Sequence, residues 1–272
     1  MDGLGKLMSA SGIGLWGVCA LDRLPPFLPC RAADRLPAGA GAVIVCLFPY
    51  YTGEFPRRNV ARYAVAGDYH QVAGDMLRSA SGRLEAAFPR EAAAYFVDNS
   101  PLREVEAARL AGLGVVGRNG QLIHPVYGSR VFIGAIVTTL SLTPSLPMDG
   151  DCLSCGSCAA ACPTGALQGG SLDTARCRSH ITQKKGTITP WEEEQIRLGG
   201  MAWGCDCCLD ACPMNRERPL SPIEAFYHNP APLLTAENLD SLLGDRAYAY
   251  RGKRVLLRNL SIITISDYRA CP

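Results

Sequence analysis

The stretch CLSCGSCAAACPTGAL, residues 152–167, contains four cysteines with the spacing C-x2-C-x2-C-x3-C-P. Three thiolates two residues apart can wrap one [4Fe–4S] cubane through a tight loop, whereas the fourth usually binds the other cluster of a pair. Zinc is the alternative, but its structural sites normally use two separated C-x2-C pairs. The spacing therefore predicts a bacterial ferredoxin-like domain with two [4Fe–4S] clusters.

A second cysteine run, CDCCLDACP at residues 205–213, is incomplete. Cys205, Cys208 and Cys212 have the spacing C-x2-C-x3-C-P, but Ala202 stands where a full run would begin. Each cubane takes four thiolates. The two runs together are therefore one ligand short.

The missing ligand has two candidates, Cys177 and Cys207. Cys207 adjoins Cys208, and neighbouring side chains seldom reach the same cluster, so Cys177 is preferred. The fourth cysteine of each run is expected to bind the cluster of the other run. This rule assigns the first cluster to Cys152, Cys155, Cys158 and Cys212, and the second to Cys162, Cys177, Cys205 and Cys208.

Composition limits the class of protein. The chain has 272 residues, 48% hydrophobic and 19% charged, which suffices for two domains with buried cores. The net charge of +2 excludes a surface that binds nucleic acid everywhere, so any basic site must be local. The apolar stretch at residues 13–21 lacks a convincing cleavage site, and no other run approaches the roughly 20 residues that a membrane span needs. We expect a cytoplasmic protein without a membrane segment.

The order of the patterns predicts an α+β fold with three parts. Residues 1–147 are expected to form an α/β domain, residues 148–215 the ferredoxin-like domain, and residues 216–272 a tail of loops and short helices. Continuous β-rich runs predict strands at residues 42–48, 92–98 and 130–142. Apolar spacing and capping residues predict helices at residues 69–88, 101–110, 237–243 and 252–265.

Neither G-x-G-x-x-G after a strand nor G-x-x-x-x-G-K-[ST] occurs, so nucleotide binding is unsupported. Instead, several blocks together resemble the epoxyqueuosine reductase family. They are RYAVAGDYH at residues 62–70, VDNSPLREVEAARLAGLGVVGRNG at 97–120, the two cysteine runs with a lone cysteine between them, and RGKRVLLRNLSII at 251–263. The block at 97–120 is the most specific of them, because many families share the ferredoxin pattern.

The resemblance implies a cobalamin-dependent reductase that acts on epoxyqueuosine in tRNA. The two clusters would reduce the cobalt, and residues 1–147 would form a corrinoid-binding type of domain. Asp98 matches the acidic residue that gives a proton to the departing oxygen; the alternative is an aspartate that caps the helix expected near Pro101. Six residues match segments that line the corrinoid: Arg62, Tyr69, His70, Arg118, Asn119 and Leu122.

The alternatives for these residues are ordinary structural roles. Arg62 could form a surface ion pair with Asp68, His70 could be a partly buried histidine at a helix start, and residues 118–122 could form a glycine-rich turn without a ligand. Basic residues could meet RNA phosphates or lie on solvated helix faces. The candidates for RNA contact are Arg176, Lys184, Lys185, Lys253 and Arg254.

Members of this family usually continue past the LLRN motif into helical repeats, so the sequence resembles a shortened member. The resemblance therefore supports the cluster and corrinoid chemistry more strongly than it supports the substrate. The expected partners are tRNA and an electron donor such as a flavodoxin or ferredoxin, and the chain is expected to be a monomer. The alternative function is a two-cluster ferredoxin that passes electrons to another corrinoid protein or redox partner.

Overall fold

The computed structural model describes residues 2–168 and 171–263, and the chain divides into two compact units. The first consists of Met1–Pro49, His70–Gly117 and Gln121–Cys152, and the second of Tyr50–Tyr69, Arg118–Gly120 and Leu153–Pro272. Two segments from the first 150 residues thus belong to the second unit. Local sequence patterns gave no sign of this exchange, because it depends on contacts between residues far apart in the chain.

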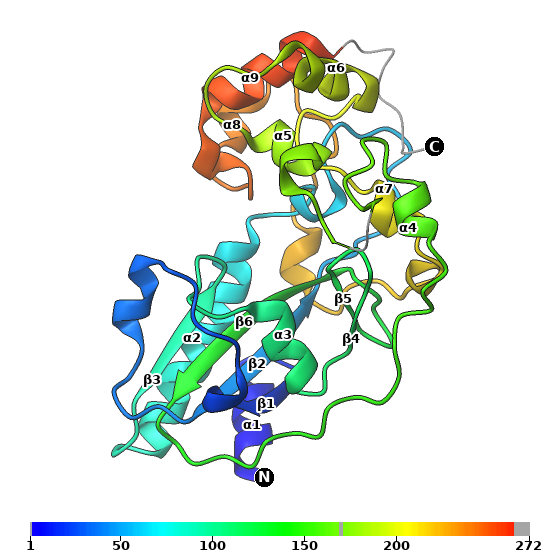
Figure 1. Ribbon diagram of the computed structural model, residues 1–272. Coiled ribbons are helices and arrows are strands. Elements are labelled where there is room, and N and C mark those ends of the chain that lie inside the picture. Colours follow the sequence, from blue (N-terminus) through cyan, green and yellow to red (C-terminus); the bar gives the residue numbers. More distant parts are fainter. Residues whose placement is uncertain (1, 169–170, 264–272) are drawn as a thin grey trace. The chain divides into compact units, whose positions relative to one another are not determined.

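The first unit is built on a four-stranded sheet with the order β1-β2-β6-β3, in which every neighbouring pair is antiparallel (Figure 1). A two-stranded ribbon of β4 and β5 accompanies it. The elements in chain order are α1 (Asp2–Ala10), β1 (Trp16–Ala20), β2 (Ala42–Pro49), α2 (Tyr69–Ala87), β3 (Ala93–Val97), α3 (Glu104–Leu110), β4 (Val115–Val116), β5 (Leu122–Ile123) and β6 (Val131–Thr138).

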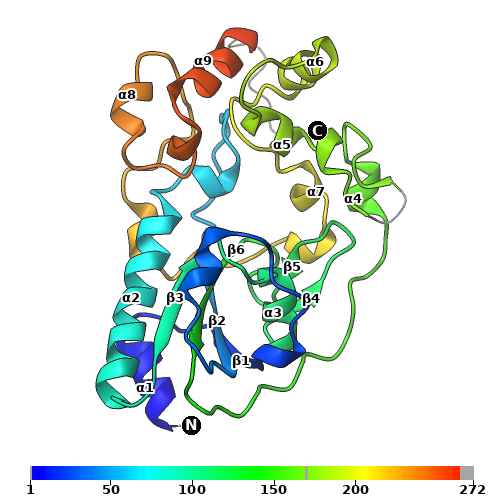
Figure 2. The same ribbon diagram turned by 60° about the vertical axis from the view of Figure 1, so that its left-hand side comes forward.

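Helices cover both faces of the sheet, which explains why all eight residues of β2 are buried. Val45 and its partner Ala135 on β6 belong to the core cluster that includes α3. On the opposite face, Gly134 lies so close to Leu77 of α2 that an added Cβ would stand 2.6 Å from the Leu77 Cδ1. Figure 2 shows α2 and α3 on the two sides of the sheet.

The expected mixture of helices and strands is confirmed, and all three predicted strands are present as β2, β3 and β6. The strand β1 was missed, because its short apolar run was considered only as a possible signal peptide. The predicted helix at residues 101–110 begins three residues late, at Glu104. The reason is a turn in which the Leu102 amide donates to Ser100 Oγ at 3.1 Å.

The second unit is mostly short helices. They are α4 (Ser157–Ala160), α5 (Arg178–Gln183), α6 (Pro190–Gly199), α7 (Cys207–Asp210), α8 (Leu239–Leu242) and α9 (Lys253–Ile262). The start of α6 has a clear signal, because Thr189 and Glu192 form a capping box, with Pro190 in the first turn. The predicted helix at residues 252–265 corresponds to α9, and its last two residues lie outside the described part of the chain.

Buried side-chain amides tie distant parts of this unit together. Asn259 of α9 donates to the carbonyl oxygens of Thr182 and Ala202 at 2.7 and 2.8 Å. Asn59, from the inserted segment, donates to Leu234 O at 2.7 Å and accepts from the Leu234 amide at 2.8 Å. Satisfied buried amides of this kind specify one packing arrangement, because an alternative would leave them unpaired.

A buried ion pair anchors the inserted segment Tyr50–Tyr69 to the second cysteine run. Arg58 Nη1 lies 2.6 Å from Asp206 Oδ2, and both side chains are only 2% exposed. Breaking such a pair would leave one uncompensated buried charge.

No helix in the described residues has the length and apolarity that crossing a membrane requires.

Candidate functional site

The two cysteine runs adopt the same local form, a tight loop followed by a one-turn helix. The first run leads into α4 and the second into α7, and these two helices pack against each other. The first loop depends on left-handed backbone at Ser154 and Gly156, whose φ angles are 50° and 77°. Tight turns of this kind allow closely spaced thiolates to wrap one cubane.

Four thiols of the second unit influence one another's ionisation. Burial raises the pKa of Cys208, and with the smaller effects of the nearby sulfurs of Cys205, Cys177 and Cys162 it reaches about 12. Burial likewise raises the pKa of Cys205 to about 11, with Cys177 again among the causes. The fold therefore brings the four cysteines of the expected second cluster, including the lone Cys177, close enough for their charges to interact.

The buried charge of Arg178 indicates whether the surroundings of these cysteines suit an anionic cluster. Its side chain is only 8% exposed, and its Nε has no hydrogen-bond partner among the described residues. Burial lowers its pKa, while the sulfurs of Cys205 and Cys162 act in the opposite direction. A buried cation without a carboxylate partner is costly. Four thiolates around an iron–sulfur cluster would supply the missing negative charge, so the residues fit the group.

Within residues 2–168 and 171–263, no three histidine, cysteine, aspartate or glutamate side chains are grouped tightly enough to share a single metal ion. Sulfur–hydroxyl contacts accompany individual cysteines of the first run instead. Cys155 Sγ lies 3.3 Å from Ser157 Oγ, and Cys162 Sγ lies 3.6 Å from Thr164 Oγ1. Hydrogen bonds to cluster sulfurs are one of the means by which a protein sets a cluster's reduction potential.

Asp98 follows directly after β3 in the left-handed region of backbone conformation, which few non-glycine residues adopt and which aspartate and asparagine tolerate best. Its φ is 50°, and that of Asn99 is 33°. Non-glycine residues in this left-handed region concentrate where function fixes the chain. Asp98 Oδ1 accepts from the Asn99 amide at 2.9 Å, and Asp98 Oδ2 lies 3.3 Å from His70 Nε2. The position before α3 that could cap the helix is occupied by Arg103, not by Asp98.

Glu104, the first residue of α3, is a nearby carboxyl group that the sequence did not single out as functional. Its pKa is raised to about 8, chiefly by burial and also by the charge of Asp98, while His70 acts in the opposite direction. Its Oε1 is buried without a hydrogen-bond partner in the described structure. From sequence, Glu104 was only one of the acids in a helix's first turn, and its burial depends on the tertiary fold. It is protonated near neutral pH and forms a group with Asp98 and His70.

We expect Glu104 to make the stability of the protein fall as pH rises. Its pKa is higher in the folded chain than in the unfolded one, so the folded state binds more protons between about pH 4.5 and about pH 8. Glu104→Gln should remove this slope and make the variant more stable than wild type above pH 8. Urea unfolding of both proteins from pH 5 to pH 9 measures the difference.

Glu106→Gln is the matched control on the same helix. A hydrogen bond from Arg109 is the main cause that lowers the pKa of Glu106, so its stabilising effect is lost as pH falls. The two variants should therefore differ from wild type in opposite directions at high pH, where Glu104→Gln is more stable and Glu106→Gln is less stable than wild type. Equal pH profiles for wild type and Glu104→Gln would contradict the protonated state assigned to Glu104.

The residues expected to line a corrinoid have varied surroundings. Arg62 is 11% exposed and pairs with Asp210 at 3.1 Å and Glu54 at 2.7 Å, so it forms ion pairs as its structural alternative has it, but with these acids instead of Asp68. Tyr69 and His70 begin α2, Arg118 is exposed and Asn119 is buried. Leu122 was expected in a loop, but it lies in β5 and its side chain is part of the first unit's core.

The basic residues expected to contact RNA fall into two groups. Lys184 pairs with Glu192 at 2.7 Å, and Lys253 pairs with Asp240 at 2.6 Å. Arg176 donates to Thr164 O at 2.9 Å and lies 5.6 Å from the ring centroid of Trp191. By contrast, Lys185 and Arg254 line one pocket, together with Arg251 and Arg258 from the same basic stretch as Arg254.

The matches to known protein families fall on two separate parts of the chain. Residues 31–99 match the family model described as "Epoxyqueuosine reductase QueG, DUF1730", and residues 151–215 match "4Fe-4S double cluster binding domain". The second match identifies the cysteine region as a double-cluster domain. The epoxyqueuosine reductase of Bacillus anthracis is 33% identical over 212 residues, which are 74% of this chain and 55% of that protein. The chain thus spans little more than half the length of the curated relatives it matches.

Solved structures have the same fold. The epoxyqueuosine reductase of Streptococcus thermophilus superposes with a TM-score of 0.78 and 25% identity, over 96% of this chain and 80% of that chain. A crystal structure of epoxyqueuosine reductase with an epoxyqueuosine-modified tRNA-Tyr stem loop has a TM-score of 0.81 at 23% identity, with the same coverage of both chains.

Proposed function

The chain belongs to the epoxyqueuosine reductase family, and on that premise we propose that it is a cobalamin-dependent reductase that converts epoxyqueuosine to queuosine in tRNA. The observation that carries the proposal is the left-handed turn at Asp98, which holds its carboxylate beside His70 at the end of β3. The double-cluster domain at residues 151–215 supports the redox part of the proposal. The relative solved with a modified tRNA stem loop supports the substrate.

Each cofactor has a proposed set of ligands. The clusters would be held as the cysteine spacing predicts, and the shared electrostatics of Cys162, Cys177, Cys205 and Cys208 support the second set. When bound, the corrinoid would supply the reducing chemistry that removes the epoxide oxygen. The residues proposed to contact it are Arg62, Tyr69, His70, Arg118, Asn119 and, through its backbone, Leu122.

The protein's own residues would provide the protons. Reduction of an epoxide to an alkene breaks two C–O bonds, consumes two electrons and two protons, and releases water. Asp98 would give a proton to the departing oxygen, as general acids do in reactions of this kind. Glu104 is protonated below about pH 8 and, with His70, can replenish the proton that Asp98 has given up.

The expected partners follow from this chemistry. A flavodoxin or ferredoxin would deliver electrons to the clusters, and a cytoplasmic location would give access to tRNA. We also propose that the protein is a monomer, because one chain would carry both types of cofactor.

Reconstitution without oxygen tests the proposal directly. Protein supplied with iron, sulfide and cobalamin should hold about eight irons per chain, as two cubanes require. It should also bind one cobalamin and show a cobalt(II) signal in electron paramagnetic resonance that disappears on reduction. Eight irons without cobalamin uptake would favour the alternative, a two-cluster ferredoxin that serves another corrinoid protein or redox partner. Zinc in place of iron would contradict both functions.

A further inference from the structure

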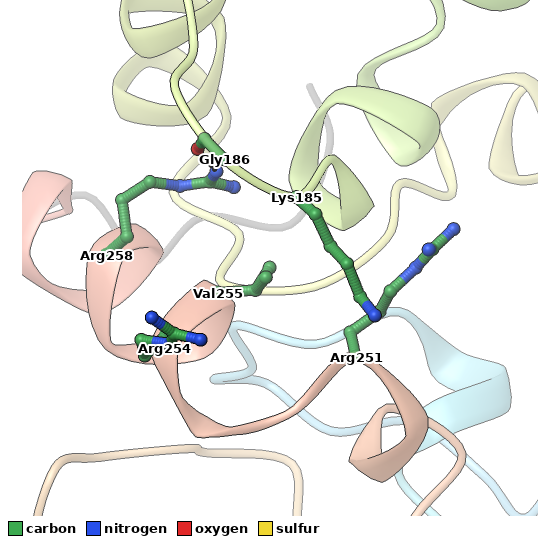
Figure 3. A pocket seen from close by; sticks show the side chains of 6 residues that line it. All are labelled: Lys185, Gly186, Arg251, Arg254, Val255 and Arg258. Carbon is green, nitrogen blue, oxygen red and sulfur yellow. Dashed lines mark hydrogen bonds between the residues drawn. The ribbon is translucent and has the colours of Figure 1, made fainter.

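A pocket of about 370 Å³ opens in the second unit beside α9 and the loop that joins α5 to α6 (Figure 3). Four of the residues that line it are cations, and the other two are uncharged. The lining consists of Lys185, Gly186, Arg251, Arg254, Val255 and Arg258. A concave surface lined by cations without an acid is electrostatically suited to an anion.

Local structure brings these cations together. Arg254 and Arg258 are four residues apart on α9, so their side chains share one face of that helix, and Arg251 ends the short helix just before it. Arg258 Nη1 donates to the carbonyl oxygens of Lys184 and Gly186 at 2.8 and 3.0 Å. Arg258 therefore fastens the loop to α9, and Figure 3 shows Lys185 extending from that loop toward Arg251.

The charges in the pocket are largely uncompensated. Among the described residues, no carboxylate pairs with Lys185, Arg251 or Arg254. The Nε of Arg251 is buried and has no hydrogen-bond partner in that part of the chain. Glu192 is the acid that acts on Arg258, but Lys184 and the capping box of α6 already engage it. Cations around a pocket that no carboxylate pairs with indicate a ligand that supplies negative charge.

We propose that this pocket binds a backbone phosphate of the RNA substrate. The inference rests on the proposed function, because it takes tRNA as the substrate. A guanidinium matches a phosphate with two parallel hydrogen bonds, and a lysine adds a mobile point charge. A phosphodiester would satisfy Arg251 and neutralise the mutual repulsion of the four cations. Free inorganic phosphate shares this chemistry and is the competing source of the anion.

The test uses the intact chain and a fluorescently labelled anticodon stem loop. Arg254→Ala and Lys185→Ala should each weaken binding about tenfold, the effect of losing one charge-assisted hydrogen bond. Each should also reduce the slope of log affinity against log salt concentration by about one. Arg197→Ala is the control, because it removes one positive charge from an exposed arginine of α6 that pairs with Glu193 and Glu194. Thermal melts verify that all three variants are folded.

A second measurement locates the contact on the RNA. One phosphate at a time is replaced by an uncharged methylphosphonate, and the loss at the phosphate in the pocket should not add to the loss caused by Arg254→Ala. Additive losses at every phosphate would overturn the proposal. A second result would also overturn it. In that result, the pocket variants bind the stem loop as tightly as wild type, but Arg254→Ala removes the thermal stabilisation that inorganic phosphate gives at constant ionic strength.

The outcome separates this inference from the proposed function. Wild-type protein that binds no stem loop would overturn both the pocket's ligand and the tRNA substrate. Normal epoxide reduction with unchanged RNA affinity in the pocket variants would overturn the pocket alone. Loss of RNA affinity in those variants, in a protein that fails to take up cobalamin, would support the pocket and reject the proposed reductase.

Discussion

Asp98→Ala should lower the rate of epoxide reduction by a factor of about 10²–10⁴, the usual contribution of a positioned general acid. The carboxyl group lies at a fixed point beside His70, so removing it takes away the proton donor without disturbing a core residue. Single-turnover reduction of an epoxyqueuosine stem loop by fully reconstituted protein measures the effect. Iron content and stem-loop affinity should stay unchanged, because the substitution is distant in sequence from the cysteines and from the basic pocket.

Two further substitutions separate proton donation from structure. Asp98→Asn preserves the shape and the hydrogen bond to the Asn99 amide but cannot donate a carboxyl proton, and it should be as slow as Asp98→Ala. Asp75→Ala removes an exposed carboxylate of α2 that pairs with Arg78, and it should react at the wild-type rate. Full turnover by Asp98→Asn would show that the proton comes from another group.

Cys177→Ala should eliminate one of the two clusters and reduce the iron content from about eight to about four atoms per chain. The reason is that Cys177 would be the fourth ligand of the second cluster, beside Cys162, Cys205 and Cys208. A cubane held by only three protein thiolates has one iron without a protein ligand, which should destabilise the whole cluster and release it. Iron analysis and low-temperature electron paramagnetic resonance of the reduced protein detect the change.

The matched comparison is Cys207→Ala, which removes the other candidate ligand. Cys207 is buried at the start of α7, next to Cys208, and its replacement should leave both clusters in place. The reverse result, with full iron in Cys177→Ala and half in Cys207→Ala, would require a different partition of the ligands. The buried positive charge of Arg178 should also stabilise the reduced form of the cluster beside it, whichever cysteines bind that cluster.

Several features were accessible from local sequence because they depend on short spacings. The cysteine runs predicted the double-cluster domain, since the loop that wraps a cubane is set by neighbouring residues. Continuous apolar runs predicted β2, β3 and β6 for a similar reason. The exception is instructive: a fully apolar strand is typical of parallel sheets, yet β2 is antiparallel and owes its burial to helices on both faces.

The sequence by itself determined where the cysteine runs and the strands β2, β3 and β6 occur, because each is encoded in adjacent residues. Only the tertiary structure decided which charges remain available. It paired Lys184 and Lys253 with acids, left Lys185 and Arg254 beside Arg251 and Arg258, and buried Glu104 near Asp98. Burial and ion pairing depend on residues that are remote in the chain, and one amino-acid type can therefore be a solvated ion in one place and a protonated or unpaired group in another.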